Sequence, residues 1–179
     1  DFGGNYSAGA TTFNGTDIFA TGLVNFSQHS IRKYSAANGA LGSETNLSPD
    51  FYVSRLLSSG ADIWVIGTQG RYPSPTQWRI EKRQASTGAL DTAFATSGVF
   101  LANSSSVVFD ATISGTSIYI LAYEYMSDHQ GSRAILGKLS GSGTLDLAFG
   151  QGGLVTRPVY RERSPSEIYV SNGEIGLLY

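Results

Sequence analysis

The segment Ser86–Phe94 reads STGALDTAF, and it returns with few changes as Ser142–Phe149, which reads SGTLDLAF. Both copies share the form Gly-x-Leu-Asp-x-Ala-Phe. A glycine and a short apolar run follow each copy, at Gly98–Leu101 and Gly153–Val155. A period of about 50 residues that holds only strand-length apolar segments is typical of a β-propeller or a related repeat array. This repeat therefore indicates a fold built from repeated β-strand units.

A second pattern accompanies the first. A turn glycine followed by a run of β-branched and aromatic residues occurs four times, at Gly15–Ala20, Gly60–Val65, Gly115–Ile120 and Gly173–Leu178. Such runs pack well on a pleated surface, and a glycine before them favours a tight hairpin turn. We expect each run to be the second strand of one repeat.

One repeat can be divided into strands from the sequence. Apolar alternation and turn residues predict strands over Ser106–Ala111, Ser117–Tyr123, Arg133–Leu139 and Gly153–Thr156. Four antiparallel strands make one propeller blade. The aspartate of the Gly-x-Leu-Asp turn is expected to accept hydrogen bonds from nearby backbone N–H groups. The predicted fold is all-β, a propeller-like array of four-stranded antiparallel blades.

The residues of the repeated turn resemble a known family, the bacterial delta-60 repeats. Leu145–Gly153 follows that family's signature, Gly-x-Leu-Asp-x-x-Phe-Gly-x-x-Gly, and Leu90–Phe94 with Gly98 follows it with Ala95 in place of a glycine. Asp1–Asn5 resembles the tail of a further copy. The resemblance implies a propeller of such repeats and carries over no catalytic residue.

The repeats are expected to form one domain over residues 1–179. Their bounds are roughly 6–48, 49–102 and 103–158, with a partial repeat over 159–179, so the chain holds about three and a half repeats. Closed propellers have 4–8 blades. Three alternatives follow: a fragment of a longer polypeptide, a ring completed by a second copy, or a smaller non-propeller β-domain. We favour a domain excised from a longer chain that forms a homo-oligomer.

Composition limits the possible partners. Charged residues make up 15% of the chain, the formal net charge is -2, and cysteine is absent. Nucleic acids and anionic membranes need basic surface, so neither is expected as a partner. The abundance of glycine, serine and threonine with little lysine suits a secreted or cell-surface bacterial protein, which we predict.

Catalytic and metal-binding patterns are weak in this sequence. No zinc motif, nucleophile elbow or phosphate-binding loop occurs, and nothing in the spacing of Glu81, Glu124 and Glu162 marks a glycosidase pair. Asp91 and Asp146 could contact calcium, but each turn offers a single carboxylate, which favours a structural role. We predict no enzyme activity, no cofactor and no metal site.

Recognition remains as the expected function. The loops between second and third strands emerge on one face of such an array, and loops on a rigid scaffold commonly carry function. The predicted ligand-binding residues are His29, Arg71, Tyr72, Trp78, Tyr125, Asp128 and His129. Tyr72 and Trp78 have an alternative role as core residues between blades. The expected partner is a protein or carbohydrate on another surface, and the alternative is a purely structural module of an envelope or fibre protein.

Overall fold

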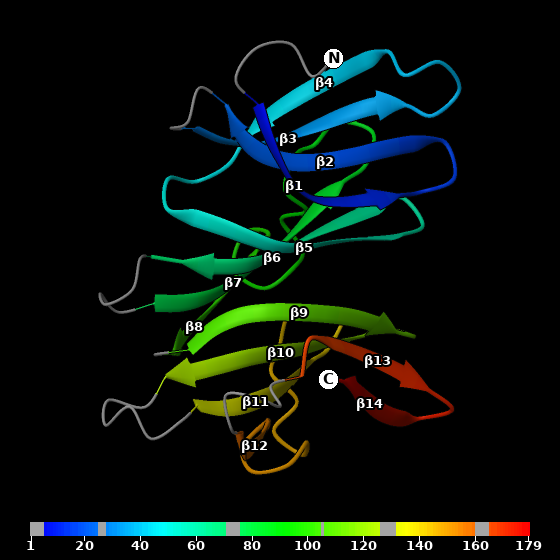
Figure 1. Cartoon of the computed structure of the whole chain (residues 1–179). Helices are drawn as coiled ribbons and strands as arrows, with labels where there is room; N and C mark the ends of the chain where they lie inside the picture. Colours follow the sequence, from blue (N-terminus) through cyan, green and yellow to red (C-terminus); the bar gives the residue numbers. More distant parts are fainter. Residues whose placement is uncertain (1–5, 25–27, 71–75, 105, 126–131, 160–164) are drawn as a thin grey trace.

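The computed structural model describes residues 6–24, 28–70, 76–104, 106–125, 132–159 and 165–179, and these residues form strands and turns without a helix. Three four-stranded antiparallel sheets follow one another along the chain, and a two-stranded hairpin comes last. The prediction of an all-β fold built from four-stranded antiparallel sheets is confirmed. Figure 1 shows the sheets stacked in chain order.

The strands are paired in the order in which they occur in the sequence. Sheet 1 contains β1 (Tyr6–Phe13), β2 (Asp17–Val24), β3 (Gln28–Ser35) and β4 (Leu41–Asn46). Sheet 2 contains β5 (Phe51–Ser59), β6 (Asp62–Gln69), β7 (Thr76–Gln84) and β8 (Val99–Ser104). Sheet 3 contains β9 (Ser106–Ser114), β10 (Ser117–Tyr125), β11 (Ser132–Leu139) and β12 (Leu154–Val159). The last hairpin contains β13 (Glu167–Ser171) and β14 (Glu174–Leu178).

Stacking explains why the second strands are apolar on both faces. In β6, Ile63 and Val65 belong to a cluster shared with sheet 1, whereas Trp64 and Ile66 belong to a cluster shared with sheet 3. Successive side chains of a strand point to opposite faces, so a strand between two sheets must bury both sets. A third cluster joins sheet 3 to the last hairpin. The core is thus divided into three layers between consecutive sheets.

The first strands of consecutive sheets lie beside one another, β1 by β5, β5 by β9 and β9 by β13. Polar groups connect them. Ser54 donates a hydrogen bond to the carbonyl of Val108 at 2.7 Å. Buried Asp110 accepts from the N–H of Ile168 at 2.9 Å and pairs with Arg55 at 3.0 Å. A single carboxylate on β9 therefore ties β5 and β13 to the same edge.

The first strand of each four-stranded sheet also carries a β-bulge. The register shifts between Ala8 and Thr11 in β1, and beside Ser54 in β5 and Phe109 in β9. In all three, the residue before the bulge pairs with the same position of the second strand, which is Gly22, Gly67 or Ala122. Bulges increase local twist, so their recurrence bends β1, β5 and β9 at equivalent positions.

In the last hairpin, the turn glycine stands one residue closer to the second strand than in sheets 2 and 3. Its two-residue turn is Asn172-Gly173, with both residues at positive φ, 51° and 80°. The turns at Gly60 and Gly115 instead have the glycine first. Positive φ at both positions is the type I′ geometry that Asn-Gly favours. When the repeats are aligned on their turn glycines, the residues of β14 are therefore offset by one position from those of β6 and β10.

The missing glycine of the repeated turn is also accommodated. Ala95 stands where the second copy has Gly150, and it adopts the same left-handed backbone, with φ of 44° against 60°. An L-residue tolerates this conformation at some cost in strain. The departure from the repeat signature thus leaves the backbone of the turn unchanged.

Substitution of Gly67 tests how closely the bulge approaches β6. A Cβ at Gly67 would overlap the carbonyl oxygen of Tyr52 and lie 2.9 Å from the Cα of Val53. We expect Gly67→Ala to lower the free energy of unfolding in urea by about 1–3 kcal/mol. Gly42→Ala is the matched control, because its Cβ would lie 3.6 Å from the nearest atom. Equal stability of the two variants would contradict the close approach.

Candidate functional site

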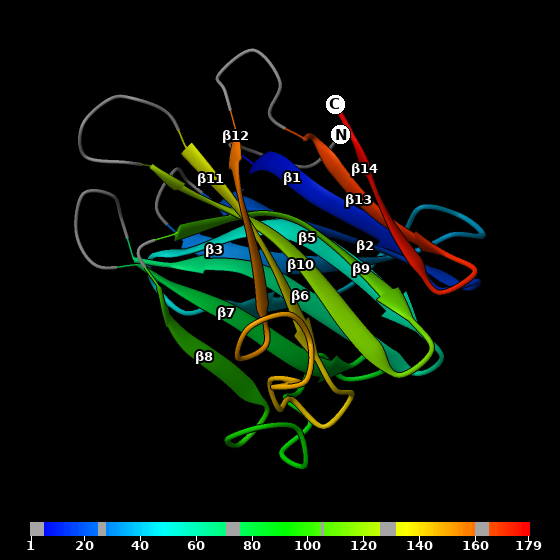
Figure 2. The same cartoon turned by 90° about the horizontal axis from the view of Figure 1, so that it is seen from below.

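The second and third strands of each sheet are joined at the same end of the stack. The joined ends are Val24 and Gln28 in sheet 1, Gln69 and Thr76 in sheet 2, and Tyr125 and Ser132 in sheet 3. Figures 1 and 2 both show these strand ends on one side of the molecule. This end is where the sequence places the binding loops.

Most of the predicted loop residues lie outside the described residues. These are Arg71, Tyr72, Asp128 and His129. Tyr125 is the last residue of β10, where its backbone pairs with β11. Their role in binding stays a prediction.

Trp78 is a core residue. Its side chain is 2% exposed and belongs to the cluster between sheets 2 and 3. The indole Nε1–H donates to the hydroxyl of Ser106 at 2.8 Å, and a Cβ on Gly137 would lie 2.6 Å from the ring. A buried and hydrogen-bonded indole fills space between sheets. Trp78 therefore takes the core role that the sequence left open, and its assignment to the ligand-binding surface is corrected.

His29 lines a cavity at the predicted end. It is the second residue of β3, and its ring meets that of Tyr52 edge to face at 5.1 Å between centroids. The cavity measures about 180 Å³ and lies between sheet 1 and β5. Its lining residues are Gly9, Thr21, Gly22, Leu23, His29, Tyr52 and Val53. Two aromatic residues and two glycines thus line one small cavity.

Tyr52 is the member of this site that sequence reasoning missed. It is the second residue of β5 and pairs with Thr68 near the end of β6. Tyr52 lies in β5 of sheet 2, and its contact with His29 is a contact with sheet 1. Contacts between sheets depend on stacking geometry, which no local pattern encodes.

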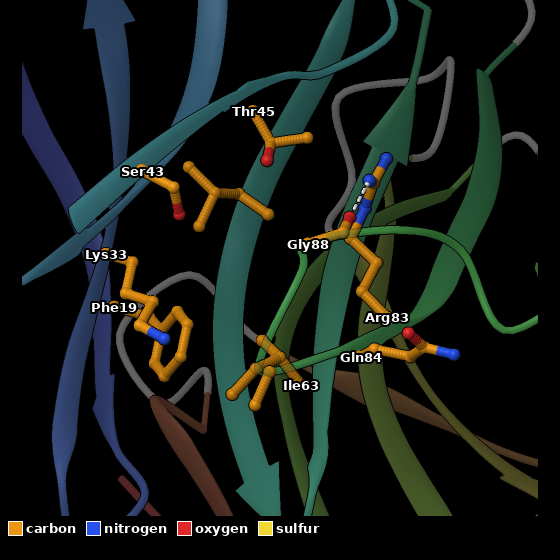
Figure 3. Close-up of a pocket in the computed structure, with 10 residues that line it drawn as sticks. Phe19, Lys33, Ser43, Thr45, Ile63, Arg83, Gln84 and Gly88 are labelled. Atoms are coloured by element: carbon orange, nitrogen blue, oxygen red, sulfur yellow. Dashed lines mark hydrogen bonds between the residues drawn. The ribbon is translucent and has the colours of Figure 1, made fainter.

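A second hollow between the same sheets is too small for an organic ligand. It measures about 20 Å³, room for roughly one water molecule. Figure 3 shows Phe19, Lys33 and Thr45 of sheet 1 facing Ile63 and Arg83 of sheet 2 across it. It is a packing defect rather than a binding site.

Beside this hollow lies a buried ionic cluster on β7. Glu81 is 0% exposed, and its carboxylate forms salt bridges with Arg79 at 2.6 Å and with Arg83 at 2.7 Å. Arg83 also donates to the carbonyl of Gly88 at 2.7 Å. Buried charges persist only when paired and hydrogen-bonded. Glu81 is therefore committed to the structure of sheet 2.

The two turn aspartates are structural as well. Asp91 accepts a hydrogen bond from the N–H of Ala93 at 3.1 Å, and Asp146 accepts one from Ala148 at 3.2 Å. Lys82 lies 2.7 Å from Asp91, and Lys138 lies 2.8 Å from Asp146. The prediction that these aspartates cap their turns is confirmed.

The lysines occupy one repeated position that sequence reasoning overlooked. The chain has three lysines, Lys33, Lys82 and Lys138. They pair across the second and third strands with Phe19, Trp64 and Tyr119 respectively. Each is also ion-paired with an aspartate of its own sheet. The signal was the scarcity of lysine together with its occurrence once in each of the three repeats.

These ion pairs shift the pKa values of their members. The hydrogen bond from Lys82, with that from the backbone of Ala93, holds the pKa of Asp91 below its usual value of 3.8. The hydrogen bond from Lys138 does the same to the pKa of Asp146. The pKa of Lys82 is raised by its hydrogen bonds to Asp91 and Asp62.

A metal-binding cluster and a membrane-spanning helix are both absent from the described residues. No group of three or more histidine and acidic side chains lies close enough to hold a metal ion within those ranges. The same residues contain no helix long and apolar enough to cross a membrane. No known family model matches the chain. A comparison with curated proteins found no significant match.

Stability at low pH tests the turn aspartates. A carboxyl whose pKa is lower in the folded state stabilises fully above its unfolded pKa, and this is lost as pH falls through the folded value. We expect the unfolding free energy in urea to fall as pH drops from about 5 to below the usual carboxyl pKa of 3.8, and to fall less for Asp91→Asn and Asp146→Asn. Asp50→Asn is the control, since Asp50 forms no ion pair with described residues. Identical pH profiles for all four proteins would refute the role of these pairs.

Removal of Glu81 tests the buried cluster. Glu81→Ala leaves Arg79 and Arg83 without their shared carboxylate, and breaking a buried pair in this way costs about 3–5 kcal/mol. Glu44→Ala removes the partner of Arg32 in a more exposed pair, where about 0–1 kcal/mol is expected. Urea denaturation at neutral pH measures both changes. A loss for Glu81→Ala no larger than that for Glu44→Ala would contradict this role.

Proposed function

We propose that the sheets are blades of a propeller-like array of the delta-60 type. Their order along the chain, their face-to-face packing and the adjacent first strands support this arrangement. In a propeller, each blade of four antiparallel strands packs against the next around a central axis. The two copies of the Gly-x-Leu-Asp turn occupy equivalent positions after β7 and β11, as such blades require.

We further propose that this domain recognises a partner surface and is not an enzyme. The observation that carries the proposal is the cavity of about 180 Å³ bounded by His29 and Tyr52. Its lining residues Leu23 and His29 lie next to the joined ends of the second and third strands of sheet 1. Rigid strands thus hold two aromatic side chains beside loops, an arrangement suited to binding.

The size of the cavity limits what it accepts. Sites for whole drug-sized ligands measure about 300–1,000 Å³, so a cavity of about 180 Å³ fits a smaller group. One sugar ring or one side chain of a partner protein meets this limit. Tyrosine offers a flat apolar face with a hydroxyl at its edge, which suits either group. The recognised group accordingly projects from a larger glycan or protein.

The state of the carboxylates supports a non-enzymatic role. Glu81 is held by two arginines, and Glu124 is paired with Arg133 at 2.9 Å. A glycosidase needs two carboxyl groups facing one substrate, and these two are engaged within their own sheets. We place the domain at the surface of a bacterial cell or outside it, where partners carry glycans and proteins.

A purely structural module is the second candidate. It is favoured by the exposed apolar row on the outer face of sheet 1, where Phe13, Ile18 and Leu41 are exposed. Such a row suits assembly with another sheet rather than binding of a soluble ligand.

Nuclear magnetic resonance tests the recognition proposal. The isotopically labelled chain would be titrated with galactose, N-acetylglucosamine, fucose and sialic acid, and then applied to an array of bacterial and animal glycans. We expect at least one sugar to shift the signals of Thr21, His29 and Val53. Tyr52→Ala should weaken that binding about tenfold or more, because it removes one wall of the cavity.

Phe109→Ala is the matched control, since Phe109 is an exposed aromatic residue of β9 outside this cavity. It should leave the affinity unchanged. Signals that shift only elsewhere, or equal loss in both variants, would remove this cavity from consideration.

A further inference from the structure

The second strand of every sheet has isoleucine as its second residue. These are Ile18 in β2, Ile63 in β6, Ile118 in β10 and Ile175 in β14. Ile63 belongs to the cluster shared with sheet 1, Ile118 to that shared with sheet 2, and Ile175 packs on that shared with sheet 3. This isoleucine therefore faces the preceding sheet in each of these three cases.

The third residue of the same strands faces the other way. Phe19, Trp64 and Tyr119 belong to or pack on the clusters shared with the following sheet. Each junction consequently brings the aromatic residue of one sheet into the cluster that holds the isoleucine of the next. The pairs are Phe19 with Ile63, Trp64 with Ile118, and Tyr119 with Ile175.

On the outer faces of sheet 1 and of the last hairpin, these positions have no neighbouring sheet within the described residues. On sheet 1, Ile18 is 40% exposed, whereas Ile63 and Ile118 are 2% and 1% exposed. Ile18 lies in a row across all four strands, formed with Phe13, Tyr34 and Leu41. We name this row of four residues the head face.

On the last hairpin, the third residue of the second strand is Gly176. The ring of Tyr169, from the paired position on β13, lies where a Cβ of Gly176 would be. An aromatic ring thus covers this position as in the other sheets, although it comes from the neighbouring strand. Tyr169 is 47% exposed, and Leu178 beside it on the same face is also exposed. We name Tyr169, Gly176 and Leu178 the tail face.

We propose that the head face of one copy of this chain packs against the tail face of a second copy. A second copy fits because three junctions within the chain already pack an aromatic residue of one sheet with the isoleucine of the next. Tyr169 against Ile18 of a second copy would be a fourth junction of the same kind. This assembly does not rest on the recognition proposed above.

The two faces differ from each other, so the contact is heterologous. Such contacts close into a ring when the rotation between copies permits, and otherwise continue as a filament. Either product joins one head face to one tail face. This property makes the proposal testable with two kinds of variant.

The experiment measures the mass of the purified chain by light scattering and analytical ultracentrifugation over about two orders of magnitude in concentration. The wild-type chain should associate. Ile18→Lys disables the head face, and Tyr169→Lys or Leu178→Lys disables the tail face, because a lysine buried in an apolar contact loses hydration without gaining a partner. Each variant alone should be monomeric, with association weakened about tenfold or more.

The decisive measurement is made on a mixture of Ile18→Lys with Tyr169→Lys or Leu178→Lys. A chain with a disabled head retains its tail, and a chain with a disabled tail retains its head, so an equimolar mixture should form a 1:1 dimer and nothing larger. Leu147→Lys is the matched control, because Leu147 is an exposed apolar residue in a turn away from both faces. It should associate like the wild type.

Three results would overturn the proposal. These are a wild-type chain that stays monomeric at every concentration, variants that associate as the wild type does, and a mixture that stays monomeric. Circular dichroism confirms that each variant is folded. The two tail variants guard against a local effect at Tyr169, since Leu178→Lys leaves the ring over Gly176 in place.

Discussion

The structure depends on one constraint, that sheets 2 and 3 bury both of their faces. A strand in such a sheet has no solvent side, so odd and even residues meet different neighbours. On β7, Trp78 and Ile80 join the layer with sheet 3, while Arg83 lines the hollow shared with sheet 1. Full burial of a large apolar side chain contributes about 1.5–3 kcal/mol. The stack is held mainly by these layers rather than by hydrogen bonds between sheets.

The same constraint explains where charge is tolerated. Glu81 lies in a layer that cannot hydrate it, and two arginines of the same strand compensate it. Asp110, at the edge formed by the first strands, has Arg55 and a backbone N–H as partners. Each of these two buried carboxylates therefore has an arginine partner close by. The cavity at His29 and Tyr52 is a place where two sheets leave space instead.

Local patterns predicted strands and turns well because their causes are local. Positive φ in tight turns favours glycine or asparagine, and β-branched runs favour strands, so the second strands at Ile63 and Ile118 could be predicted directly. The shift at Asn172 was missed because two turn types place the glycine differently. Burial of Trp78 and the approach of Tyr52 to His29 arise between sheets, where sequence spacing carries no information. The bulges were missed for a related reason, since a bulge is a property of pairing.

The repeated lysine has a consequence for digestion of the folded protein. Each of the three sheets contains a single lysine, within its third strand and held by an aspartate. A protease that cuts after lysine needs several residues in an extended, unpaired form, so each site becomes available only when its sheet opens. When opening is fast relative to cutting, the cleavage rate reports the free energy of that opening. Lysine-specific proteolysis thus supplies three internal reporters, one for the local stability of each sheet.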